Sequence, residues 1–170
     1  MTLTSLESIV SALNRHNVRY LIVGGLAVAA HGYGRLTIDV DLVVQLIPEN
    51  VQSTISALEM LGYKPLVPVR ALDFAVPEKR QEWVEQKNMV VFSLRSDMHP
   101  YTPVDIFASE PFDFDTEYNR ALVGEISPGE EARFVCLETL IQMKEAAGRP
   151  KDSEDVRQLR LILEKLDERA

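Results

Sequence analysis

Two aspartates, Asp39 and Asp41, stand two residues apart in a stretch that alternates apolar and polar residues. The alternation predicts a β-strand, and residues i and i+2 of a strand share one face. The two carboxylates are then separated by about 6.6 Å along the strand, because each residue adds about 3.3 Å. This spacing suits two divalent cations about 3.5–4 Å apart, the arrangement used in two-metal phosphoryl chemistry. A solvated polar face on an edge strand is the alternative, so the Asp-x-Asp pair alone decides little.

Two glycines and a third aspartate favour the chemical interpretation. Gly24 and Gly25 end a short apolar strand, where glycine permits close approach to the backbone and the first amides of a helix attract phosphate. A plain tight turn is the alternative for the glycines. Asp105 lies within the apolar segment Val104–Phe107, and a buried strand carboxylate needs a partner such as a metal ion. An exposed position on an open side of the sheet is the alternative for Asp105.

Two basic residues are candidates to contact phosphate. Arg35 shortly precedes the Asp-x-Asp strand. Lys144 lies seven residues after Leu137, on a helix face that should be apolar. Its ammonium group is therefore expected to meet a salt bridge or a phosphate, unless it extends to the helix edge. Asp152 and Asp155 fit the pattern of an N-cap and its reciprocal capping residue.

The elements that must position these residues form a mixed α+β pattern with a helical pair at the C-terminal end, and not a clean run of βα repeats. Within residues 63–88 only an extended piece and a helix over 78–86 are indicated. The other predicted helices cover 4–16 (with Thr4 as N-cap), 26–31, 48–61, 113–120, 137–147 and 152–168. The predicted strands cover 20–23, 37–46, 89–95, 103–108 and 121–126.

The composition is that of one globular domain. The 170 residues are 46% hydrophobic and 26% charged, and no linker divides them. We expect a single domain, 1–170, with a core over about 1–127 and a helical part over about 136–168. The single cysteine, Cys136, excludes an internal disulfide and a cysteine zinc cluster. The net charge of -8 argues against a long nucleic acid as partner, and the lack of a basic leader or long apolar run predicts a cytoplasmic protein without membrane contact.

The segment 20–44, YLIVGGLAVAAHGYGRLTIDVDLVV, resembles the signature of the nucleotidyltransferase superfamily with the DNA polymerase beta-like fold. That signature has Gly-Gly or Gly-Ser at a strand end, a short helix, Asp-x-Asp on the next strand and a third Asp on a later strand, which Asp105 matches. The pattern is similar to that of small bacterial stand-alone nucleotidyltransferases, including the abortive-infection type. Their C-terminal helical motif resembles residues 144–155. Residues 63–102 and 109–135 are outside the resemblance.

The resemblance implies a reaction and a site. Asp39 and Asp41 would coordinate two Mg²⁺ ions, with Mn²⁺ as an alternative, that bridge the triphosphate of ATP or another nucleoside triphosphate. Asp105 would bind the catalytic ion and help to deprotonate an acceptor hydroxyl. Backbone groups of Gly24 and Gly25 would hold the β- and γ-phosphates. A nucleoside monophosphate would move to the hydroxyl, and pyrophosphate would be released.

The leading hypothesis is therefore a Mg²⁺-dependent nucleotidyltransferase in which Arg35 and Lys144 also bind nucleotide. Its acceptor is expected to be a small molecule or a protein. The alternative is a binding or regulatory module that has this fold without turnover, such as a partner in a toxin–antitoxin pair. Gly-Gly in place of the commoner Gly-Ser removes one hydroxyl from the phosphate site and favours that alternative, whereas the Gly-Gly spacing disfavours a nuclease or phosphatase. A homodimer or a cognate partner protein is expected.

Overall fold

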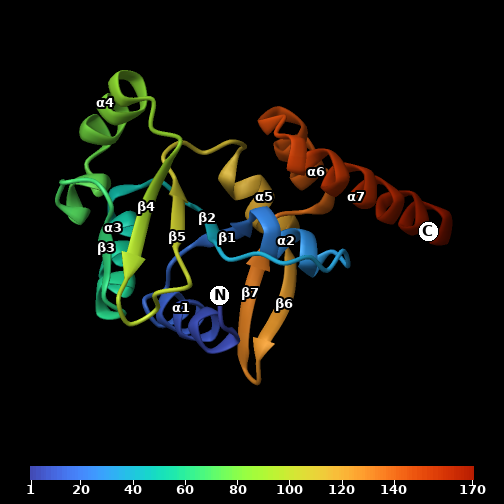
Figure 1. Cartoon of the computed structure of the whole chain (residues 1–170), viewed down its shortest axis with the longest axis horizontal. Coiled ribbons are helices and arrows are strands. Elements are labelled where there is room, and N and C mark those ends of the chain that lie inside the picture. The colour runs from blue at the N-terminus through green and yellow to red at the C-terminus, as the bar shows by residue number, and fades with distance from the viewer.

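A seven-stranded mixed sheet forms the centre of the computed structural model, which describes all residues from Met1 to Ala170. The strand order is β3-β4-β5-β2-β1-β7-β6 (Figure 1). Helices lie on both sides of the sheet, and two helices end the chain, so the predicted α+β class is confirmed. The strands are β1 (Tyr20–Val23), β2 (Val40–Val44), β3 (Tyr63–Pro65), β4 (Val91–Ser96), β5 (Val104–Phe107), β6 (Leu122–Ser127) and β7 (Glu130–Phe134). The helices are α1 (Leu3–Arg15), α2 (Gly24–Ala30), α3 (Pro48–Met60), the 3₁₀-helix η1 (Ala71–Ala75), α4 (Pro77–Lys87), α5 (Phe114–Arg120), α6 (Leu137–Ala147) and α7 (Pro150–Arg169).

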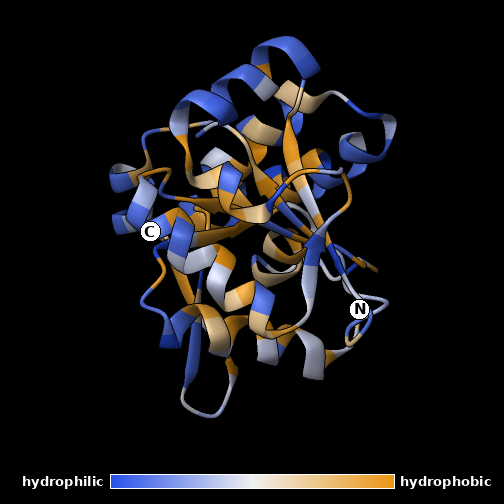
Figure 2. Ribbon diagram, turned by 90° about the vertical axis from the view of Figure 1, so that its left-hand side faces the viewer, coloured by the Kyte–Doolittle hydropathy of each residue, from blue (hydrophilic) through white to orange (hydrophobic).

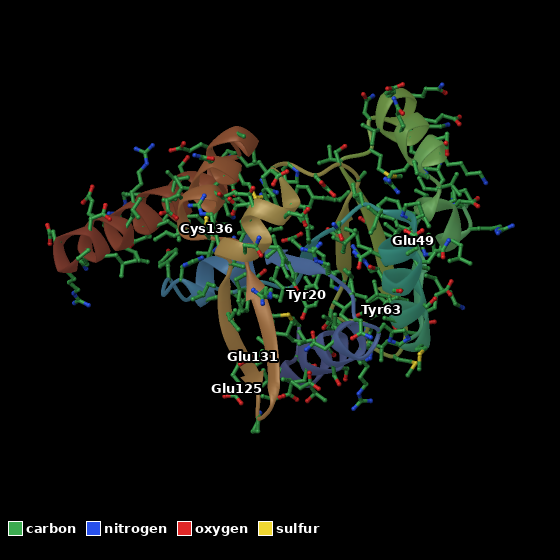
Figure 3. The ribbon with its side chains drawn as sticks, turned by 180° about the vertical axis from the view of Figure 1, so that it is seen from behind. Tyr20, Glu49, Tyr63, Glu125, Glu131 and Cys136 are labelled. Carbon is green, nitrogen blue, oxygen red and sulfur yellow. The ribbon has the colours of Figure 1, made fainter.

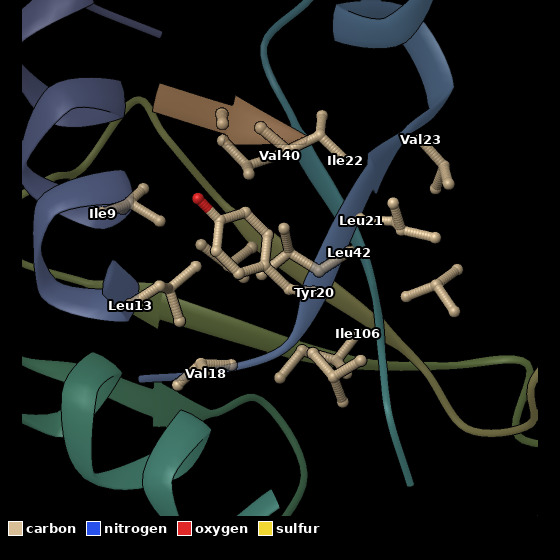
Figure 4. Close-up of a cluster of buried hydrophobic side chains, with 14 of the residues drawn as sticks. Ile9, Leu13, Val18, Tyr20, Leu21, Ile22, Val23, Val40, Leu42 and Ile106 are labelled. Carbon is tan, nitrogen blue, oxygen red and sulfur yellow. The ribbon is translucent and has the colours of Figure 1, made fainter. Parts of the chain in front are cut away.

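One face of the sheet is buried under α1 and α3. Leu13 of α1 belongs to the same hydrophobic cluster as Leu42 of β2 and Ile106 of β5, and all three are fully buried (Figure 4). Burying a leucine or isoleucine side chain contributes about 1.5–3 kcal/mol, so this layer holds β2 and β5 firmly in place. Apolar residues accordingly gather on the inner strands, and polar residues on the outer helices (Figure 2).

The opposite face is covered over only part of its width. Helix α2 packs on β1, β2 and α6, and α5 lies over β7, where the guanidinium of Arg133 stacks on the ring of Tyr118 at 4.4 Å. No helix lies in front of β4 and β5 in the view of Figure 1. The uncovered part of the sheet therefore begins next to β2. None of the helices combines the length and the apolar character needed to cross a membrane.

The strand that carries the Asp-x-Asp pair is shorter than predicted. It begins at Val40 and not at Thr37, because β1 ends at Val23, opposite Asp41, and offers no backbone partner further on. Ile38, which lies within the predicted strand 37–46, is outside the sheet and is 56% exposed. Asp39 therefore belongs to an extended segment that leads into the strand, while Asp41 is part of the strand.

Some predicted helix starts are also wrong. Helix α1 is capped by Thr2, whose Oγ1 accepts a hydrogen bond from the Ser5 amide at 3.2 Å, so Thr4 is inside the helix. Helix α2 begins at Gly24, two residues earlier than predicted. Helix α7 begins at Pro150, since proline suits the first helical position, and Asp152 is therefore not its N-cap.

Strand β7 was not predicted. Its outward-facing residues are mostly charged (EEARF) and hide the alternation, although Ala132 and Phe134 are buried. It forms a hairpin with β6, turning at Gly129, and then pairs in parallel with β1. The sheet thus extends to Phe134, beyond the boundary expected near residue 127.

Candidate active site

Two of the three predicted aspartates are neighbours in the middle of the sheet. β2 and β5 are parallel, and their register places Asp41 directly opposite Asp105. The two side chains project from the same face, on strands about 4.8 Å apart. Asp39 lies two residues before Asp41 and is half-buried. Its charge is close enough to raise the pKa of Asp41.

The aspartates form an anionic cluster that nearby cations compensate only in part. Burial, the charge of Asp105 and then the charge of Asp39 raise the pKa of Asp41 to about 6, while Lys144 and Arg149 act in the opposite direction. The Oδ1 atom of Asp105 is buried and accepts no hydrogen bond. Buried carboxylates in this situation are stabilised by a cation. No three acidic, histidine or cysteine side chains converge as a ready-made metal site. Asp41 and Asp105 face each other across neighbouring strands, whereas Asp39 precedes the strand.

Gly24 allows the carboxylate of Asp41 to reach the backbone at the start of α2. A Cβ atom on Gly24 would lie 2.0 Å from Oδ2 of Asp41, far inside van der Waals contact. The φ angle at this residue is +65°, a value that side chains other than glycine rarely adopt. Glycine therefore meets two requirements at this position: it leaves room for the carboxylate of Asp41, and it adopts the left-handed backbone conformation.

Gly25 makes room for Thr37 and Arg35. A Cβ atom on Gly25 would lie 2.6 Å from Oγ1 of Thr37 and 3.3 Å from a terminal guanidinium nitrogen of Arg35. A serine side chain would not fit here without moving Thr37. The hydroxyl of Thr37 therefore lies where a serine side chain at position 25 would begin. This position of Thr37 was not predicted, because residue 37 was expected to begin the strand.

Lys144 lies in a buried ion-pair network and not at an open surface. Its side chain is 4% exposed, and its ammonium group donates to Oδ1 of Asp152 at 3.1 Å and to Oδ2 of Asp155 at 2.8 Å. Arg149 donates to Asp152 at 2.7 Å, and Arg35 pairs with Asp155 at 2.8 Å. The salt bridge expected for an inward-facing Lys144 is therefore present. The network ties α6 and α7 to the segment that leads into β2.

The network contains functional candidates that the sequence interpretation did not include. Asp152 and Asp155 were expected to cap a helix, but they are almost fully buried and hold three basic side chains. Burial alone would raise the pKa of Asp152, but hydrogen bonds from Arg149 and Lys144 outweigh it and lower the pKa. The spacing of three residues, which puts both carboxylates on one helix face, was the available signal. Nucleotide binding by Arg35 and Lys144 stays a prediction.

A separate cavity of about 420 Å³ lies at the other end of β1. It is lined by polar residues that include Tyr20, Glu125 and Glu131, and Figure 3 shows the two glutamates on the β6–β7 hairpin. Tyr20 begins β1, whereas Gly24 directly follows the strand. The cavity is therefore distinct from the aspartate cluster, which occupies the open sheet face.

Comparison with known proteins identifies the fold. No protein-family profile and no curated protein match the sequence. The antibiotic-resistance factor ANT(2'')-Ia is similar in structure with a TM-score of 0.59 and 18% identity, over 96% of this chain and 83% of that one. The lincosamide antibiotic adenylyltransferase LnuA, solved with lincomycin bound, has a TM-score of 0.60 and 16% identity over 95% and 98% of the chains. An antigenic nucleotidyltransferase-like protein from Paracoccidioides brasiliensis has a TM-score of 0.54 and 17% identity over 94% and 74%.

These similarities extend over nearly the whole chain and show that it has the nucleotidyltransferase fold. The resemblance seen in residues 20–44 is thus confirmed at the level of the fold. Two of the similar proteins are named for reactions or resistance that involve antibiotics, which is a property of those proteins.

Proposed function

We propose that this protein is a nucleotidyltransferase that moves a nucleoside monophosphate from a nucleoside triphosphate to a hydroxyl of a small molecule. The observation that carries the proposal is the direct pairing of Asp41 with Asp105 on a sheet face that is open beside them. Two similar structures support it: the adenylyltransferase LnuA with lincomycin bound, and ANT(2")-Ia in complex with adenylyl-2"-tobramycin.

The acidic residues fit a divalent metal site. Asp105 has a buried carboxylate oxygen that accepts no hydrogen bond. Burial and the charges of Asp105 and Asp39 raise the pKa of Asp41. Asp41 and Asp105 would hold Mg²⁺ or Mn²⁺, and Asp39 would complete the ligand set from the segment before β2, since carboxylates are the ligands these ions prefer. The bound ions would neutralise the phosphate charges and polarise the α-phosphorus.

Side chains of the protein would bind the triphosphate and accept the proton of the acceptor hydroxyl. Arg149 is half exposed and is close enough to Asp41 for the two charges to interact, so it can approach the triphosphate. The acceptor oxygen forms a bond to the α-phosphorus, the bond from that phosphorus to the pyrophosphate oxygen breaks, and the electron pair leaves with pyrophosphate. Asp105 accepts the hydroxyl proton, because it lies on the strand next to the open side of the sheet. Catalysis comes mainly from positioning and charge stabilisation.

Thermal shift with nucleoside triphosphates and Mg²⁺ tests the proposal. A ligand at one hundred times its Kd stabilises the folded state by about 2.7 kcal/mol, so at least one nucleoside triphosphate should raise the Tm by several degrees. Asp105→Asn should abolish pyrophosphate release in the presence of a mixed pool of small hydroxyl compounds. Asp97→Asn, at an exposed loop residue outside the cluster, is the matched control.

The outcomes separate transfer from binding alone. If no nucleoside triphosphate with Mg²⁺ raises the Tm of the wild type, the proposal is wrong. Nucleotide binding without pyrophosphate release on any acceptor pool would support the binding or regulatory module instead.

A further inference from the structure

The face that carries the aspartates continues onto two strands that no helix covers. Ser93 of β4 lies directly opposite Asp105 of β5, so both side chains project from the same face. β3 follows β4 at the edge of the sheet. Figure 1 shows β4 in front of α3, and no helix in front of either β4 or β5. Ser93 is half-buried, whereas Arg95 and Lys64 further along this face are exposed, so the face leads from Asp105 to two exposed side chains on β4 and β3.

Two basic residues form a pair on this open face. Arg95 lies two residues after Ser93 and shares its face, and Lys64 of β3 is directly opposite Arg95. Both side chains are exposed, and neither takes part in any of the salt bridges of the chain. The guanidinium of Arg95 donates only to the carbonyl of Leu94, at 3.2 Å.

The pairing of Lys64 with Arg95 destabilises the folded protein when no ligand is bound. Like charges directly opposite each other destabilise a pair of strands, and no carboxylate neutralises Lys64 or Arg95. An anion bound between them would remove the repulsion and accept charge-assisted hydrogen bonds. From the strand spacing and rise, the Cα of Arg95 lies about 8 Å from that of Asp105, and the Cα of Lys64 about 12 Å.

The direction of transfer places the acceptor on this side. In phosphoryl transfer the attacking and leaving oxygens are roughly in line on opposite sides of the phosphorus. Gly24 and the basic groups of Arg35 and Arg149 lie on the β1 side of Asp41, where the leaving pyrophosphate can be held. The attacking hydroxyl must then come from the β4 side.

We propose that the acceptor is a hydroxyl compound with an anionic group, phosphate or carboxylate, which binds between Lys64 and Arg95 while its hydroxyl reaches Asp105. The assignment rests on the proposed function, because that function defines which side of the aspartates takes the acceptor. It restricts the substrate class to small anionic molecules with about 6–10 Å between the hydroxyl and the anion, given the reach of the two basic side chains across neighbouring strands.

Sugars that share one ring test the charge requirement. Backbone amide shifts of ¹⁵N-labelled protein are recorded with glucose 6-phosphate, glucuronate, glucose and glucosamine, which carry a phosphate, a carboxylate, no charge and an amine. At least one of the two anions should shift amides around Lys64 and Arg95 with a millimolar Kd, and the two anions tell which group is preferred. Glucose and glucosamine should leave these amides unchanged.

Variants then place the binding site. Lys64→Gln with Arg95→Gln should weaken anion binding about tenfold, whereas Lys87→Gln, at an exposed lysine of α4, should not change it. The proposal is overturned if neither anion binds, if the double variant binds as the wild type does, or if the amide shifts centre on Gly24 and Arg149. Thermal shift with nucleoside triphosphate and Mg²⁺ is measured on the same variants without sugar, so a failure of nucleotide binding is read independently of a failure of anion binding.

Discussion

Replacing Asp41 by Asn should stabilise the folded chain when no divalent metal is present. Burial and the charges of Asp105 and Asp39 raise the pKa of Asp41 from its usual 3.8 to about 6. The ionised carboxylate is therefore less stable in the folded state than in the unfolded state. The difference between the two pKa values corresponds to about 3 kcal/mol at pH 8, at 1.36 kcal/mol for a tenfold change. Asparagine keeps the shape of the side chain and removes the charge.

Proton binding by Asp41 makes this stabilisation depend on pH. Between about pH 4 and pH 6 the carboxyl is ionised in the unfolded state and protonated in the folded state, so the wild type loses stability as the pH rises through this window. The asparagine side chain does not titrate. The advantage of Asp41→Asn should therefore be about 3 kcal/mol at pH 8 and about half as large at pH 5.

Urea unfolding followed by circular dichroism at both pH values, with EDTA present, measures the effect. Asp97→Asn is the control and should change the free energy of unfolding by less than about 0.5 kcal/mol, as an exposed substitution does. Mg²⁺ should narrow the difference at pH 8, because an ion compensates the wild-type carboxylate and not the amide. The reasoning would be refuted if Asp41→Asn were no more stable than the wild type at pH 8. It would also be refuted if the gain in free energy of unfolding were the same at pH 5 and pH 8.

Three more predictions follow from the contacts. Gly24→Ala should abolish the thermal shift caused by nucleotide and Mg²⁺, because its Cβ would lie 2.0 Å from Oδ2 of Asp41; Gly34→Ala, whose Cβ would meet nothing within 4 Å, should retain the shift. Lys144→Met should lower the free energy of unfolding in urea by about 3 kcal/mol, since it leaves two buried carboxylates without their shared ammonium group, and the exposed Lys151→Met should have little effect. EDTA should abolish pyrophosphate release, and excess Mg²⁺ should restore it; release that continues in EDTA would contradict a metal-dependent reaction.

The local part of the site could be predicted from the sequence, because it depends on periodicity. The Asp-x-Asp spacing, the glycines after β1 and the apolar surroundings of Asp105 each indicated a position in one element. The pairing of Asp41 with Asp105 depends on strand order, which brings together residues 64 positions apart in sequence. A single sequence has no signal for that register. The resemblance to a family implied only that the three aspartates act at one metal site.

The ion pairs of Lys144 could not be predicted from the sequence, for a different reason. Its position on an apolar helix face predicted an inward-facing charge, but the capping interpretation of Asp152 and Asp155 hid the partners. Both patterns, a cap and a buried ion pair, place carboxylates near the start of a helix. The position of Pro150 distinguishes them, because a proline at the first helical position makes Arg149 the N-cap and places Asp152 inside the helix.

The two sides of the aspartate pair differ in how their basic groups are compensated. On the β1 side three cations share two buried carboxylates, so most of their charge is used to fix α6 and α7 against the site. On the β4 side, Lys64 and Arg95 are exposed and have no carboxylate partner. A triphosphate arrives with cations that neutralise it, and needs only a small local excess of positive charge. An acceptor anion brings no metal ion of its own, and so it needs the uncompensated pair. The net charge of -8 therefore says little about substrate charge, which this local arrangement determines.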